Sequence, residues 1–107
     1  EEVLKFAEEM PSFPGGETAL QTYLQANTRF PQMEKESGKQ GTVYVNFVVG
    51  KDGSVSSVTI LKSVPGAPGF DNEAKRVVNS MPRWTPGKMN GRSVTVQMSL
   101  PIRFVLK

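Results

Sequence analysis

A long alternation of apolar and polar side chains near the end of the chain constrains the fold more than any other feature. Apolar residues occupy every second position from Val94 to Leu106, with mostly polar residues between them. A period of two places the apolar side chains on one face, as in a strand with one buried side. The run exceeds the usual strand of about five or six residues. It predicts one long strand over residues 94–106, whose register is set by the core.

Two further segments alternate and are joined by a turn. Residues 42–49 place Val43, Val45, Phe47 and Val49 on one face, which predicts a half-buried strand. The Asp52-Gly53 pair is a strong hairpin signal, so residues 54–61 are expected to return as the next strand. In that strand Val55 is out of parity with Val58 and Ile60, which predicts a bulge near residues 56–57.

Helical periodicity appears twice. Residues 16–27 carry one apolar stripe, and Phe70, Ala74, Val77 and Val78 form a second stripe in a helix that Pro82 ends. We expect Asp71 to cap the start of this second helix. Pro31 and Gly38 bound a short helical turn after the first helix.

Residues 83–91 look irregular, and we assign Trp84, the only tryptophan, to the core. The cluster of Pro and Gly over residues 10–16 excludes a continuous helix or a central strand there. We therefore expect residues 1–16 to form an arm with a possible short strand, and residues 17–107 to form the domain proper.

The order of elements predicts an α+β fold. The strand over 42–49 lies between the other two, giving a small three-stranded antiparallel sheet of order 2-1-3, with both helices packed on one face. The long last strand then lies on an edge, and its unpaired backbone groups could accept a strand from a partner. Pro101 partly blunts this edge, because proline has no N–H to donate.

Composition excludes several kinds of chemistry. The 107 residues include no His and no Cys, so thiol nucleophiles, disulfides and His/Cys zinc sites cannot form. Asp71 and Glu73 stand where acidic residues favour a helix start, and Asp52 stands in a turn, so none is assigned to catalysis. We expect no enzyme, no metal and no cofactor.

The charges and the apolar runs also limit the partners. Thirteen Lys and Arg against ten Asp and Glu give a net charge of +3, and the cations are scattered, so nucleic-acid binding is not expected. The sequence has no apolar run long enough to cross a bilayer. Because it begins at Glu1 without an initiator methionine, we expect any membrane anchor to lie outside it.

An ordered set of motifs resembles one known family. These motifs are FP at 30–31, GTVYVNFVV at 41–49, DGSV at 52–55, FDNEA at 70–74, MPRWTPG at 81–87 and PIRF at 101–104. No single motif is specific, but their order over about residues 17–106 resembles the C-terminal periplasmic domain of TonB proteins. The arm resembles the variant common in Bacteroidetes-type envelope proteins. Phe30 stands where the family often has Tyr.

The resemblance implies a non-enzymatic coupling domain. Such domains belong to inner-membrane proteins that partners of the ExbB/ExbD type drive with the proton gradient. They bind the TonB box, a short N-terminal segment of TonB-dependent outer-membrane transporters, as an added strand, and they transmit force for uptake. The implied contact residues are Asn27, Thr28, Arg29, Val94, Thr95, Val96, Gln97, Met98, Ser99, Leu100, Pro101, Ile102, Arg103 and Phe104. We further expect Arg29 to favour boxes with acidic or polar residues.

Other interpretations of the sequence stay open. The same fold could be the periplasmic domain of an envelope sensor or of another anchored protein, or a small regulatory ligand-binding domain. A long exposed edge also permits edge-to-edge or strand-swapped dimers. Residues 3–7 of the arm could themselves pair with an edge and compete with the box.

Overall fold

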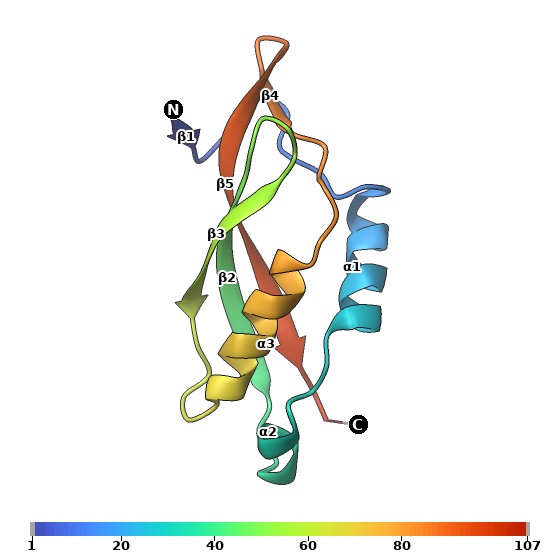
Figure 1. Ribbon diagram of the computed structural model, residues 1–107, viewed down its shortest axis with the longest axis vertical. Coiled ribbons are helices and arrows are strands. Elements are labelled where there is room, and N and C mark those ends of the chain that lie inside the picture. Colours follow the sequence, from blue (N-terminus) through green and yellow to red (C-terminus); the bar gives the residue numbers. More distant parts are fainter. Residues whose placement is uncertain (1, 107) are drawn as a thin grey trace.

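The computed structural model, which describes residues 2–106, has a twisted sheet with one helix packed across it, a second helix beside it and a short third helix at one end (Figure 1). The helices are α1 (Gly16–Asn27), α2 (Gln32–Glu36) and α3 (Pro68–Asn79). The strands are β1 (Val3–Leu4), β2 (Gly41–Val49), β3 (Val55–Lys62), β4 (Gly87–Met89) and β5 (Arg92–Phe104). The α+β class expected from the sequence is confirmed.

The sheet is larger than expected and is mixed. Within residues 2–106 it has five strands in the order β1-β5-β2-β3, and β4 pairs with β5 outside this path. The predicted arrangement of β3, β2 and β5 is confirmed, since β2 is antiparallel to both neighbours. The possible short strand in the arm is confirmed as β1, which runs parallel to β5 and makes the sheet mixed, whereas β4, which also pairs with β5, was not predicted.

The β4–β5 hairpin lies in the segment that we expected to be irregular. Asn90 and Gly91 form its turn, with φ angles of 52° and 76°. Two successive positive φ values match the type I′ turn that Asn-Gly favours. The Asn-Gly signal was therefore present, but only three residues precede it in β4 and their alternation is too short to detect. Trp84 is buried, as predicted.

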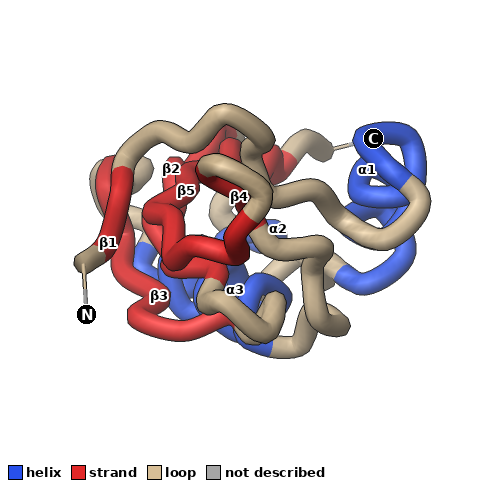
Figure 2. Tube along the Cα trace, turned by 90° about the horizontal axis from the view of Figure 1, so that it is seen from above, coloured by secondary structure: helices blue, strands red, loops and turns tan. Residues whose placement is uncertain are grey.

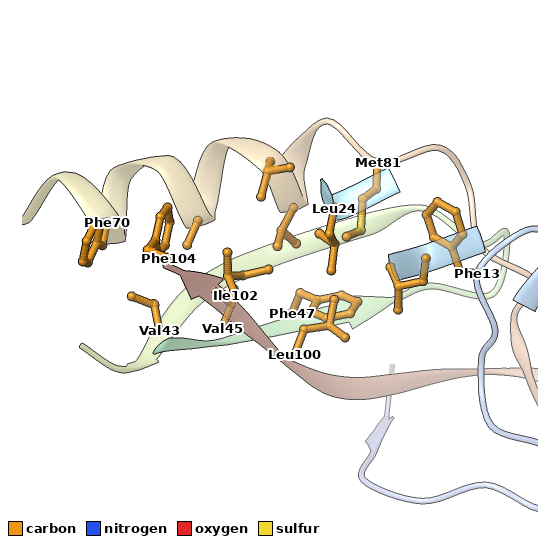
Figure 3. Close-up of a cluster of buried hydrophobic side chains, with 14 of the residues drawn as sticks. Phe13, Leu24, Val43, Val45, Phe47, Phe70, Met81, Leu100, Ile102 and Phe104 are labelled. Carbon is orange, nitrogen blue, oxygen red and sulfur yellow. The ribbon is translucent and has the colours of Figure 1, made fainter. Parts of the chain in front are cut away.

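The core lies between the sheet and the helices. Figure 3 shows side chains of β2 and β5 directed toward α3, with Leu24 of α1 in the same cluster. Val43, Val45 and Phe47 are fully buried because the period of two places them on one face. The rings of Phe70 and Phe104 stack with centroids 4.2 Å apart, which joins α3 to the end of β5.

Two local predictions had different outcomes. The bulge in β3 is confirmed: Ser57 has a φ of 52°, and the register with β2 shifts beside it. The cap at Asp71 is wrong, because α3 begins earlier, at Pro68, and the Asp71 carboxylate instead accepts a hydrogen bond from Ser63. A carboxylate from α2 stabilises the helix start, since Glu34 Oε2 accepts the Gly69 N–H at 2.7 Å.

The arm packs closely against the rest of the molecule. Ala7 and Phe13 are buried. Glu9 exchanges backbone hydrogen bonds with Lys88, and Ser12 exchanges them with Thr85. β1 and α1 lie on opposite sides of the molecule (Figure 2), so the arm crosses from one side to the other before α1 begins. The arm therefore brings β1 to the edge of β5.

Candidate functional site

One edge of β5 is open along its second half. The Gly50 N–H donates to the Ser54 carbonyl at 2.9 Å, so the backbone of Gly50 faces β3. Because successive residues of a strand face opposite edges, the backbone of Val49 faces β5, where it is in register with Val96. Even-numbered residues of β5 from Val96 onward therefore face β2. Odd-numbered residues direct their backbone groups to the other edge.

Beyond β1, that outer edge is formed by Ser99, Pro101 and Arg103. No strand within residues 2–106 pairs with them on this side. Ser99 and Arg103 each carry an N–H and a carbonyl, whereas Pro101 has only its carbonyl to offer. Pro101 thus directs its missing donor outward and leaves the ladder with β2 intact, as expected for proline at an edge.

The first residues of β5 are not free, which corrects the expectation of an open edge from Val94. Val94 pairs with Gly87 of β4, and Thr95 and Val96 pair with Val3 and Leu4 of β1. Because the sheet is twisted, this edge of β5 has different neighbours along its length. In Figure 1, β5 crosses β2, so the edge faces β1 at one end and α1 at the other.

A groove of about 1020 Å³ lies where this open edge faces α1. Its walls come from α1, from the segment that follows it, from α2 and from the end of the chain. Lys35 and Arg103 are the charged residues among those lining it within the described chain, and both are cationic. The lining residues are Gln21, Leu24, Gln25, Thr28, Phe30, Lys35, Pro101, Ile102, Arg103, Phe104, Val105 and Leu106.

Aromatic packing fixes the floor of the groove. The Phe30 ring meets Phe70 and Phe104 edge-on, with centroid separations of 5.5 and 6.0 Å. This packing needs only the ring of Phe30 and no hydroxyl group. An extended segment in the groove would meet apolar rings below, backbone groups of β5 on one side and polar side chains of α1 on the other.

The predicted contact residues Asn27, Thr28 and Arg29 differ in their placement. Thr28 lines the groove, and its buried Oγ1 has no hydrogen-bond partner among the described residues. Asn27 turns its side chain back to the Tyr23 carbonyl, at 2.8 Å. Arg29 is exposed and is not a lining residue, but its N–H donates to Glu73 Oε2 at 2.7 Å. The structure thus brings Thr28 to the open edge and leaves the Arg29 side chain outside the groove.

Electrostatics tie this segment to α3. Burial of Glu73 opposes its ionisation, but hydrogen bonds from the Arg76 side chain and the Arg29 N–H outweigh that effect and lower the pKa of Glu73. The same hydrogen bond with Glu73 raises the pKa of Arg76. Both groups are therefore charged near neutral pH.

Several groove residues were absent from the sequence prediction. Gln21, Gln25 and Lys35 lie on short helices, and no local pattern shows that these helices face β5. Only the three-dimensional placement of α1 reveals them. No helix among the described residues is long and apolar enough to cross a membrane.

Comparisons with known proteins agree with this geometry. The family described as "Gram-negative bacterial TonB protein C-terminal" matches residues 26–106. No curated protein matches the chain. A solution structure of the Helicobacter pylori TonB C-terminal domain is 26% identical with a TM-score of 0.64, covering 84% of this chain and 92% of that one.

Two further solution structures have the same fold. A longer form of the Helicobacter pylori domain is 26% identical with a TM-score of 0.61, covering 84% of this chain and 79% of that one. The Pseudomonas aeruginosa TonB C-terminal domain is 24% identical with a TM-score of 0.53, covering 75% of this chain and 81% of that one. The match to the family spans the elements from α2 to β5, which include the open edge, whereas most of α1 precedes the matched residues. The chain belongs to the TonB C-terminal domain family.

Proposed function

We propose that this domain binds the TonB box of TonB-dependent outer-membrane transporters as a strand added to β5. The observation that carries the proposal is the open edge at Ser99, Pro101 and Arg103, whose last two residues line the groove beside α1. An extended peptide satisfies such an edge through its own backbone, so one site can accept boxes of different sequence.

Backbone pairing also suits the transmission of force. Each added ladder bond contributes about 0.5–1.5 kcal/mol net, so no single bond holds the complex. Several bonds formed side by side share a load applied along the strand. The pulled strand is β5 itself, which is bonded along β2 from Val96 to Phe104, so the load passes directly into the centre of the sheet.

The family assigns the domain to the periplasm of a Gram-negative cell. We propose that ExbB/ExbD-type partners act on it through an inner-membrane segment outside this sequence. The cationic Lys35 and Arg103 in the groove support a box that carries an acidic residue. They are better placed for this role than Arg29, whose side chain lies outside the groove.

A titration followed by NMR tests the proposal. Labelled domain is titrated with synthetic N-terminal peptides of TonB-dependent outer-membrane transporters, with a scrambled peptide as the control. We expect the largest backbone shifts at Ser99, Arg103 and Thr28, with the amides of β3 unaffected. Saturating peptide that shifts β3, or that shifts nothing at the β5 edge, contradicts the proposal.

A further inference from the structure

The segment that forms one wall of the groove is fixed at both ends by α3. The Asn27 carbonyl accepts a hydrogen bond from Arg76 Nη2 at 2.7 Å. The Arg29 N–H donates to Glu73 Oε2, also at 2.7 Å. Thr28, the residue that lines the groove, lies between these two anchors. Its own position is therefore set by two side chains that do not line the groove.

Glu73 and Arg76 hold each other in a fixed geometry. Arg76 donates from Nε to Glu73 Oε1 at 2.8 Å and from Nη2 to Glu73 Oε2 at 2.6 Å. The Glu73 side chain is only 12% exposed, whereas that of Arg76 is 44% exposed. A paired, two-point contact leaves the guanidinium little freedom to rotate, so the second N–H of Nη2 stays directed at the Asn27 carbonyl.

A third link fixes α1 itself to α3. The Tyr23 hydroxyl donates to the Ser80 carbonyl at 2.9 Å, and it lies 2.7 Å from the Ser80 hydroxyl oxygen. Together with the links at Asn27 and Arg29, it connects the second half of α1 and the following segment to the same helix. The distance between this wall and β5 therefore depends on how α1 is held by α3.

We propose that Glu73 and Arg76 are positioning residues for partner binding, which hold residues 27–29 in the conformation that receives an added strand. This inference rests on the proposed function. A flexible segment would have to be ordered when the partner binds, and that ordering would weaken affinity. The Glu73–Arg76 pair orders the segment in advance, so its contribution appears in the affinity although neither side chain lines the groove.

The test compares Glu73→Ala, Glu73→Gln and a matched control, Glu34→Gln. Glu34 is also a buried carboxylate that accepts one backbone N–H, but its bond caps α3 at Gly69. Affinity for the transporter peptides is measured by calorimetry where all variants are folded, and exchange of the Arg29 amide is measured by NMR. Thermal melting of each variant reports stability separately.

We expect Glu73→Ala to weaken peptide binding about tenfold and to speed exchange of the Arg29 amide. Glu73→Gln keeps an oxygen that can accept the Arg29 N–H, so its affinity for the peptides should lie between those of Glu73→Ala and the wild type. The control should lose thermal stability and keep wild-type affinity. Wild-type affinity in Glu73→Ala overturns the inference and leaves the proposed function standing. If no peptide binds the wild type, the proposed function fails and the inference, which rests on it, fails with it.

Discussion

Replacing Pro101 by alanine should strengthen partner binding. Pro101 directs its backbone to the open edge of β5, where it interrupts the row of donors between Ser99 and Arg103. Alanine restores one N–H to that row. A net gain of about 0.5–1.5 kcal/mol for one ladder bond corresponds to a two- to tenfold tighter complex. The free energy of unfolding should fall by only about 0.4–1 kcal/mol, because alanine gives the unfolded chain more conformational freedom and breaks no hydrogen bond to β2.

Proline at two neighbouring positions of β5 should separate the outer edge of the strand from the edge that faces β2. Ser99→Pro removes an outward N–H and should weaken binding by a similar factor while the domain stays folded. Leu100→Pro, one residue further, removes an N–H that faces β2 and a buried side chain, so it should destabilise the sheet by about 2–5 kcal/mol. Affinity is measured by calorimetry with the transporter peptides, and stability by urea unfolding. Equal affinities for Pro101→Ala, Ser99→Pro and wild type would refute strand addition at this edge.

One deletion and two substitutions test the contacts around the site. Deletion of residues 1–6 removes β1 from Thr95 and Val96. A peptide long enough to extend past Gln97 onto this freed edge should then bind several-fold tighter, whereas a peptide that ends at Ser99 should bind as before. Surface plasmon resonance with both peptides measures the two affinities. Gly53→Ala places a Cβ in steric clash with the Trp84 carbonyl oxygen at a φ of +86°, so the urea midpoint should fall by the equivalent of at least about 1–3 kcal/mol. Glu34→Ala leaves the half-buried Gly69 N–H without its acceptor and should cost about 1–3 kcal/mol in the same assay. The change Glu36→Ala, at an exposed residue of the same helix, should cost much less.

Periodicity in the sequence was enough to predict the main elements. The stripe over 16–27 corresponds to α1, and the alternations over 42–49 and 54–61 correspond to β2 and β3 within one residue. The long strand begins two residues earlier than predicted, at Arg92, because this polar residue after the hairpin turn does not extend the apolar alternation that starts at Val94. These elements bury whole faces, and a buried face produces a periodic signal that is independent of the rest of the fold.

Features that depend on single contacts left no such signal. The start of α3 is stabilised by Glu34, a residue 35 positions away from Gly69 in sequence, so a search for a local cap selected Asp71 instead. β1 has only two residues, and nothing in Val3-Leu4 indicates that it joins β5 in parallel. No local pattern predicts the contacts that fix residues 27–29 either, because Glu73 accepts the N–H of Arg29, which lies 44 positions earlier in the sequence.

The open edge of β5 could be predicted from the sequence, whereas the walls of the groove could not. The backbone groups of β5 follow from strand parity, so the open edge was foreseeable once the strand order was known. The width of the groove depends on α1, which is held to α3 through Tyr23 and Glu73, and its charge comes from Lys35 and Arg103. A partner that recognises backbone needs mainly the edge, whereas discrimination between partners must come from the walls. Substitutions at the β5 edge should therefore change affinity for all transporter peptides alike, and substitutions at Lys35 should change their ranking.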